Sequence, residues 1–493
     1  MIRKKTTPMT LNILMNMVLT LSGFIFPLIT FPYVSRVLLP EGNGKVQMAT
    51  SFIAYFSLVA QLGIPTYGIR ACAAVRDDKM KLTRTVHELT LIQLVTTVFA
   101  YVLFFLCLQW IPKLQQEKSL YIISSLMILL SSLGMEWLFK AMEQYTYITV
   151  RSILFKIISI IAMFLLVHSQ EDYVIYAGIT VVAAAGSNVM NLTQLRKYIH
   201  LRPVGEYQIC RHIKPVLVLF AYVCATTIYT NIDSVMLGFM ATDADVGYYG
   251  VAVKIKMILV SIVTALGTVL LPRVSYYFEQ GRIEEFWKMA EKALRVVLLI
   301  SLPLTVYFMI FARQGIFFLS GEAYLPSVPA MVIIMPTLIC IGLTSVTGIQ
   351  ILIPMKKENV VLYASIAGAV ADLIVNALLI PSMKAAGASV GTLIAEIIVL
   401  VWHVIVLHKQ ILPMLKGMKL GLIGLSTAIA AAVSFWIGNL HLPTIWTLVF
   451  SAVVFFGVYA VALHIGKDPF VIEMEGRFLP KIKKIMKRHK KDA

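Results

Sequence analysis

The sequence predicts an all-α polytopic membrane protein with about 14 transmembrane helices. Of its 493 residues 59% are hydrophobic and only 14% are charged, which leaves too few charges to cover a soluble surface of this size. Apolar stretches of about 20 residues, the length that crosses a bilayer, recur along the whole chain. The formal charge of +18 fits basic loops against anionic lipid, and no nucleic-acid partner is expected.

The predicted spans follow one another with short connections. They are residues 10–32, 46–67, 89–111, 119–139, 150–168, 173–193, 215–238, 247–271, 292–312, 328–353, 360–380, 387–408, 419–437 and 443–465. With the N-terminus inside, 34 of the 43 Lys and Arg fall in inside segments and six in outside loops. This asymmetry predicts a multi-pass protein with both termini in the cytoplasm. The N-terminus has no small-residue cleavage site, so its first span is expected to be retained.

Two hairpins, 38–70 and 240–273, share a pattern six spans apart. Each has an acidic, glycine-containing turn, a span that begins near Gly44 or Gly247, and a Pro followed by Arg70 or Arg273. Because the offset is even, the repeat axis is expected to run along the membrane normal. The predicted organisation is two six-helix lobes, 1–200 and 201–410, then two further spans in 411–466 and a basic cytoplasmic tail, 467–493.

Charged residues within the spans are candidate functional residues, because a charge at membrane depth is costly unless it is paired or hydrated. Asp233 and Lys254 lie near the outer ends of adjacent predicted spans, where a structural ion pair and substrate contact are both open. Lys256 lies about 200° around the helix from Lys254, away from the polar face. Lys156, in the fifth span, is a further buried cation that is open to a snorkelling role.

Other polar residues share helix faces. Asn12 and Asn16 recur on one face of the first span, and Thr230 shares a face with Asp233. Asp372 shares a face with Asn376 four residues on, and Glu396 lies near the middle of the twelfth span. Both carboxylates are candidates for ion or proton coupling, and structural hydrogen bonding explains them equally well.

Several chemical signatures are absent from the sequence. It has no GxxxxGK[ST] phosphate loop, no HExxH or comparable metal-ligand spacing and no GxSxG elbow. We therefore expect neither an enzyme nor a cofactor or metal.

Four segments together resemble the polysaccharide-repeat (Wzx-type) flippases of the multidrug/oligosaccharidyl-lipid/polysaccharide exporter superfamily. They are FPYVSRVLLPEGNGKVQMATSFIAYFSLVAQLGIPTYGIRACA, GMEWLFKAMEQYTYITVRSILFKIISI, YTNIDSVMLGFMATDADVGYYGVAVKI and GASVGTLIAEI. The resemblance extends over about residues 8–465. One departure is Leu39, where the family often has Gly.

The resemblance implies two lobes that work by alternating access. Its implied substrate is an undecaprenyl-diphosphate-linked oligosaccharide, which moves from the inner to the outer leaflet of the bacterial plasma membrane for surface polysaccharide synthesis. By position it implies diphosphate candidates, namely Arg36, Arg70, Lys156, Lys254 and Arg273. Arg70 and Arg273 are equally well explained as positive-inside residues. Membrane lipids, a polysaccharide polymerase and glycosyltransferases are the expected partners, and a monomer is the expected functional form.

Three alternatives stay open. A drug or cation antiporter of the same superfamily would need carboxylates in the N-terminal lobe, and the first three predicted spans contain none. A lipid-linked peptidoglycan-precursor flippase shares the expected span number and basic cavity, and only the motifs disfavour it. A membrane polymerase or glycosyltransferase usually needs a larger loop outside the membrane than this chain offers.

Overall fold

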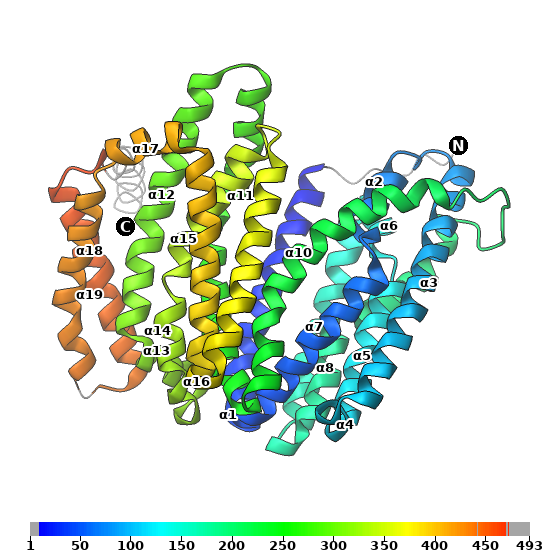
Figure 1. Ribbon diagram of the computed structural model, residues 1–493, viewed down its shortest axis with the longest axis horizontal. Helices are drawn as coiled ribbons and strands as arrows, with labels where there is room; N and C mark the ends of the chain where they lie inside the picture. The colour runs from blue at the N-terminus through cyan, green and yellow to red at the C-terminus, as the bar shows by residue number, and fades with distance from the viewer. Residues whose placement is uncertain (1–8, 441, 470–471, 473–493) are drawn as a thin grey trace, which may run out of the picture. The chain divides into compact units, whose positions relative to one another are not determined.

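The computed structural model describes residues 9–440, 442–469 and 472, and within this part the chain is helical without a β-strand (Figure 1). The all-α prediction is therefore confirmed. The longer helices are α1 (Met9–Gln61), α3 (Lys79–Trp110), α5 (Lys118–Leu133), α7 (Tyr145–Leu166), α8 (Tyr173–Ala185), α10 (Cys210–Met240), α11 (Asp243–Glu279), α12 (Ile283–Ile310), α16 (Glu358–Val406), α18 (Leu420–Phe435) and α19 (Thr444–Ile465).

Short helices connect or extend these elements. The short α-helices are α2 (Ile64–Ala73), α4 (Pro112–Gln116), α6 (Glu136–Ala141), α9 (Val189–Gln194), α13 (Ala312–Ser320), α14 (Val328–Ile334), α15 (Thr337–Thr344) and α17 (His408–Gly417). A π-helix covers Ser345–Leu352. Single 3₁₀ turns lie at Gln170–Asp172, Gly186–Asn188, Leu195–Lys197, Glu322–Ser327 and Trp436–Asn439.

Two helices each contain two predicted spans across a break. In α1 the break is Leu39, with φ 58° and ψ 178°. The backbone is strained there for a residue with a side chain, and the following Pro40 lacks the amide that would continue the helix. The Gly that the family often has at this position would adopt the same φ without strain. In α16 the break is Lys384, with φ 52°.

The number of spans stays a prediction. Ten helices of the described part are long and apolar enough to cross a membrane, or eleven if the bent pair Glu322–Ile334 and Thr337–Leu352 crosses as one. Each of the broken helices, α1 and α16, is counted as a single span in these totals. The chain is a multi-pass membrane protein.

The described chain forms two compact units. Unit 1 contains residues up to 250 together with 319–324 and 373–388, and unit 2 contains 251–318, 325–372 and the chain from 389 onward. The lobe and tail boundaries expected at residues 200, 410 and 466 stay predictions.

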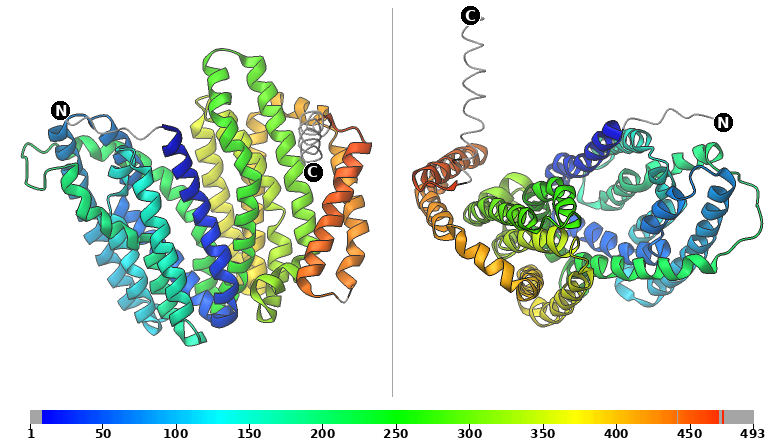
Figure 2. Two further views of the ribbon diagram at one scale, coloured as in Figure 1. Left: turned by 180° about the vertical axis from the view of Figure 1, so that it is seen from behind. Right: turned by 90° about the horizontal axis from the view of Figure 1, so that it is seen from above.

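Each unit has its own packing. In unit 1, α1 packs against α3, α5, α7 and α10. Buried apolar residues such as Phe52, Phe104 and Ile128 lie among these helices. In unit 2, α18 and α19 pack as neighbours and α12 packs against α15 and α18 (Figure 2).

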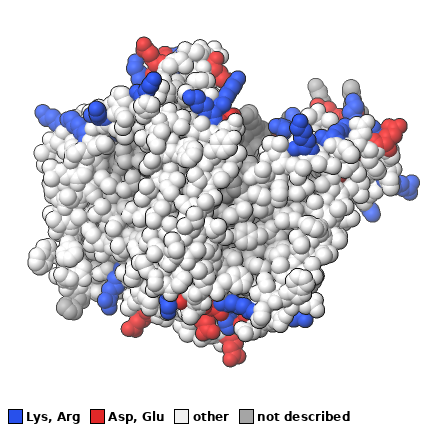
Figure 3. Space-filling view, in the orientation of Figure 1, with Lys and Arg blue, Asp and Glu red and all other residues white. Residues whose placement is uncertain are grey.

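Charged residues mark the ends of the helices. On the face in Figure 3, Lys, Arg, Asp and Glu gather at the two ends of the helices of each unit, and the surface between the ends is uncharged. The N-terminus of α3 shows how such an end is built. Asp78 caps it by accepting hydrogen bonds from the amides of Met80 and Lys81, and these donors hold the pKa of the Asp78 carboxyl below its usual range.

Candidate functional site

The predicted site residues divide between the two units. Unit 1 contains Asn12, Asn16, Arg36, Arg70, Lys156, Thr230 and Asp233, and unit 2 contains Lys254, Arg273, Asp372 and Glu396. Their convergence on one cavity stays a prediction.

Lys156 is a half-buried cation within α7. Its Nζ donates a hydrogen bond to Oγ of Ser22 in α1, at 2.8 Å. Within the described part of the chain Lys156 forms no ion pair. A lysine inside an apolar span without a neutralising carboxylate favours an anion, because an attracted anion offsets the cost of removing the ammonium from water.

Arg151, one and a half turns before Lys156 in α7, shows the opposite arrangement. It lies at the start of the predicted span 150–168, and its side chain is buried. Its guanidinium donates to Glu136 Oε2 at 3.0 Å, to Asn188 Oδ1 at 3.0 Å and to Ser187 Oγ at 3.3 Å. Glu136 neutralises this arginine, so Arg151 ties α7 to its neighbours.

Asp233 is buried in α10 and bound by two elements that are distant in sequence. It accepts a hydrogen bond from the Tyr249 hydroxyl in α11 and another from Asn376 Nδ2 in α16, at 2.6 Å. The sequence analysis placed Asn376 on a shared face with Asp372 and weighed Lys254 as the partner of Asp233. These two hydrogen bonds join α10 to α11 and α16 within unit 1. Substrate contact by Asp233 and its pairing with Lys254 both stay predictions.

The two arginines of unit 1 that are diphosphate candidates, Arg36 and Arg70, are both exposed. Arg36 donates from Nη1 to the carbonyl oxygen of Pro32 at 2.6 Å and to that of Leu319 at 3.3 Å. Arg70, in the last turn of α2, lies over the ring of Tyr67, with Cζ 6.0 Å from the ring centroid. Arg36 therefore fixes the segment at Leu319 to α1, whereas the exposed Arg70 is open to an anion.

The uncharged candidates of unit 1 differ in exposure. Asn12 is buried, and its Oδ1 accepts no hydrogen bond from any described residue. Asn16 and Thr230 are exposed. Thr230 Oγ1 bonds the carbonyl oxygen of Thr227 at 3.3 Å and accepts from Asn231 Nδ2 at 3.1 Å.

The candidates of unit 2 lie on different elements. Lys254 is half-buried in α11, and Asp372 and Glu396 are buried in α16. Arg273 is exposed near the end of α11, where its Nε donates to the Tyr277 hydroxyl at 3.0 Å. The coupling role of the two carboxylates stays a prediction.

The two repeat hairpins meet within unit 1 through their glycines. A Cβ on Gly44 would lie 1.7 Å from the carbonyl oxygen of Asp243, and a Cβ on Gly247 would lie 2.1 Å from that of Pro40. Each glycine therefore lies against the backbone of the residue four positions before the other glycine. This reciprocal contact is consistent with the predicted repeat and leaves no room for a side chain at either position.

Three lysines at this end of unit 1, Lys45, Lys113 and Lys384, lie next to carboxylates. Lys45 pairs with Glu117 at 2.9 Å, Lys113 pairs with Asp243 at 3.1 Å, and Lys384 lies 3.8 Å from Asp245. Lys113 also donates to the carbonyl oxygen of Gly238. These pairs join α1, α4, α10, α11 and α16 at the hairpin end.

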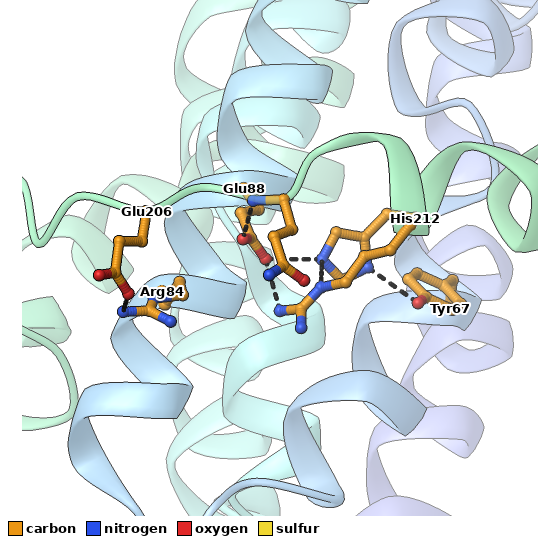
Figure 4. A network of polar contacts seen from close by, with 7 residues as sticks. Tyr67, Arg84, Glu88, Glu206 and His212 are labelled. Carbon is orange, nitrogen blue, oxygen red and sulfur yellow. Dashed lines mark hydrogen bonds and ion pairs between the residues drawn. The ribbon is translucent and has the colours of Figure 1, made fainter.

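Glu88 is a buried carboxylate that the sequence analysis missed (Figure 4). Its side chain is 0% exposed and accepts from the amide of Gln208 at 2.6 Å and from Arg211 Nη2 at 2.7 Å. His212 Nε2 lies 2.8 Å from Glu88 Oε2, and its Nδ1 lies 2.8 Å from the Tyr67 hydroxyl. The network fixes the start of α10 and its preceding connection to α3.

The start of a helix before residue 89 was the sequence signal that could have placed Glu88 in α3. The predicted span begins at residue 89, whereas α3 begins at Lys79, directly after its Asp78 cap. An Asp before a long run of helix formers is such a signal. Among the described residues no group of three or more His, Cys, Asp or Glu is placed to hold a metal ion.

Comparison with known families gives two matches. A family model described as a polysaccharide biosynthesis protein matches residues 9–278, which is more than half of the chain. A model described as MatE matches residues 219–378.

Two bacterial relatives match most of the chain. One, from Escherichia coli (strain K12), is named "Putative O-antigen transporter" and is 23% identical over 394 residues, which cover 79% of this chain and 94% of the relative. Another of the same name, from Shigella dysenteriae, is 24% identical over 414 residues, which cover 79% and 98%.

Solved structures share the fold. The lipid II flippase MurJ in an inward closed conformation superposes with a TM-score of 0.71 at 16% identity, covering 92% of this chain and 98% of that one. An inward-facing multidrug resistance MATE family transporter of the MOP superfamily gives a TM-score of 0.59 at 13% identity, covering 81% and 98%. Because these identities are low, the similarity shows a shared fold and nothing about substrate. This fold is the one that the sequence resemblance implied.

Proposed function

Because the chain belongs to the polysaccharide biosynthesis protein family, we propose that it is a flippase for an undecaprenyl-diphosphate-linked oligosaccharide repeat unit. The proposed direction is from the inner to the outer leaflet of the bacterial plasma membrane, in the synthesis of a surface polysaccharide such as O-antigen, capsule or exopolysaccharide. A polymerase would consume the translocated unit, and glycosyltransferases would supply it. The chain itself would act as a monomer by alternating access.

The position of Lys156 inside a span is the main structural support for this proposal. A diphosphate cannot enter the hydrocarbon core unaided, since it would lose the hydration of its charges. An ammonium group inside a span, already oriented by Ser22, offers a charge-assisted hydrogen bond to a phosphate oxygen. The mobile lipid tail would stay in the membrane while the polar part moves.

The remaining candidates complete the proposed path. Lys254 is a further proposed diphosphate ligand, and Arg70 and Arg273 would attract the diphosphate at the inner leaflet. Asn12, Asn16 and Thr230 would offer hydrogen bonds to sugars. Asp372 and Glu396 would couple transport to a proton or cation gradient.

The test is a translocation assay in proteoliposomes with a labelled lipid-linked oligosaccharide, which becomes accessible to an added glycosidase only in the outer leaflet. Lys156→Ala should lower the initial rate by about 10- to 100-fold, because a hydrogen bond to a charged group is worth about 1.5–3 kcal/mol. Lys156→Arg should keep most of the rate because it keeps the charge. Lys254→Ala and Lys254→Arg, assayed together, should give the same pattern.

Lys140→Ala is the matched control, because Lys140 already pairs with Glu136 at 2.8 Å and should not be needed for transport. Equal rates in wild type and Lys156→Ala, at equal protein levels, would remove Lys156 from the site. Translocation of a lipid-linked peptidoglycan precursor in preference to the oligosaccharide would instead favour the alternative flippase function.

A further inference from the structure

A groove of about 490 Å³ lies between α3 and α5 in unit 1. It is lined along α3 from Thr90 to Gln109 and by the last turn of α5 with Met135. Its size falls within the range of about 300–1,000 Å³ that is usual for ligand sites. Most of its lining is apolar, and exposed side chains such as Leu94, Val98 and Phe105 form its rim.

Three buried polar side chains line one end of this groove. Gln93 is 3% exposed, Thr97 is 7% exposed and Ser132 is 4% exposed. No described residue hydrogen-bonds Gln93 Nε2, Thr97 Oγ1 or Ser132 Oγ. Because hydrocarbon offers no hydrogen bonds, each of these groups favours a ligand that brings an acceptor.

Gln93 and Ser132 are the groups nearest to the charged layer at one end of the helices. Gln93 follows the carboxylate of Glu88 by five residues in α3, and Ser132 lies in the last turn of α5, shortly before Glu136. At about 1.5 Å per residue along α3, Gln93 lies about 7–8 Å deeper than Glu88, and Thr97 lies about 13–14 Å deeper. The polar region on each side of a bilayer is about 5–8 Å thick, so Gln93 lies near the level where acyl chains begin and Thr97 lies about one turn below it.

We propose that the groove binds an acyl chain of an ester-linked membrane phospholipid, whose ester carbonyl accepts hydrogen bonds from Gln93 and Ser132. Both side chains have a donor to offer, and an ester carbonyl oxygen is an acceptor only, with two lone pairs. The lining contains no charged residue, which disfavours a phosphate at this position. The polyprenyl tail of the proposed substrate fits less well, because its only acceptors are the charged phosphates at its end.

This site is separate from the proposed transport path and its test does not depend on transport. The full-length protein would be reconstituted with trace amounts of a photoactivatable phospholipid, in an ester-linked form and an ether-linked form with the same chains. Crosslinked peptides would then be identified by mass spectrometry. The ester form should label the α3 and α5 peptides of the groove about two- to tenfold more than the ether form, the range that a net hydrogen bond gives.

Two variants of nearly unchanged shape sharpen the test. Gln93→Leu with Ser132→Ala should bring the ester form down to the labelling of the ether form. Thr96→Val is the matched control, because the Thr96 hydroxyl bonds the carbonyl oxygen of Ala60 at 2.7 Å, so the ester preference should persist.

Three results would overturn the proposal. They are equal labelling by the two lipid forms in the wild type, an ester preference that survives Gln93→Leu with Ser132→Ala, and displacement of the label by a polyprenyl phosphate. The last of these would assign the groove to an isoprenoid chain instead. A failure of translocation by itself would leave the groove labelling unchanged and so would count against the transport proposal only.

Discussion

At the scale of single residues, charges in this protein divide by whether a partner neutralises them. Arg151 has Glu136, and Glu88 has Arg211 and the amide of Gln208. Such pairs hold helices together, because a buried charge without its partner is expensive. Lys156 has a hydroxyl in place of a carboxylate, and the anionic substrate that we propose would supply the missing negative charge.

Glu88→Ala is expected to destabilise the protein by about 3–5 kcal/mol. The substitution leaves the buried His212, the Gln208 amide and part of the Arg211 charge without their acceptor, which is the costly way to break a buried pair. Thermal unfolding in detergent, followed by the loss of monodisperse protein, would measure the change.

Glu206→Ala is the matched control, because it breaks a second contact of the same connection with α3. The Arg84–Glu206 pair is 3.0 Å long, but the Glu206 side chain is 84% exposed, so its loss should cost about 1 kcal/mol or less. If the two substitutions lower stability equally, the burial of Glu88 does not govern its contribution.

At the scale of elements, the broken helix α1 and the hairpin that begins α11 depend on each other. The break at Leu39 ends the first half of α1, and the second half then brings Gly44 against the backbone of Asp243. Ion pairs such as Lys113–Asp243 close the same end of unit 1. Backbone contact at this distance requires glycine, so the two hairpins are specified together.

Gly44→Ala should therefore destabilise unit 1 by about 1–3 kcal/mol or more, because the added methyl meets a backbone carbonyl that cannot move away alone. Gly247→Ala should behave in the same way. A lower unfolding temperature and a lower yield of membrane-inserted protein would report the effect.

Gly23→Ala provides the comparison within the same helix. A Cβ at Gly23 meets no atom within 4 Å, and alanine is the better helix former by about 1 kcal/mol, so stability should be unchanged or higher. A loss at Gly23 as large as that at Gly44 would contradict the account based on close backbone approach.

At the scale of the whole molecule, the distribution of Lys and Arg predicts the orientation in the membrane. The segment with Glu206 belongs to the predicted cytoplasmic side, and the turn with Glu41 belongs to the outer side. Both side chains are exposed, at 84% and 55%, so each position suits chemical labelling.

In a background without cysteine, a membrane-impermeant maleimide added to intact cells should label Glu41→Cys and spare Glu206→Cys. Both positions should react after the membrane is opened, which controls for accessibility. Labelling of Glu206→Cys alone in intact cells would invert the predicted topology.

The sequence by itself determined the class of this protein, its helical architecture and its family. Apolar stretches must match the thickness of the bilayer, so hydropathy reveals them without any knowledge of packing. The tertiary structure decided which polar residues belong together. Asn376, 143 residues from Asp233, is one of its hydrogen-bond partners, and Glu88 lies within α3 although the predicted span begins one residue later. Helical spacing relates only residues a few positions apart, whereas the partners of buried charges are set by how distant helices pack.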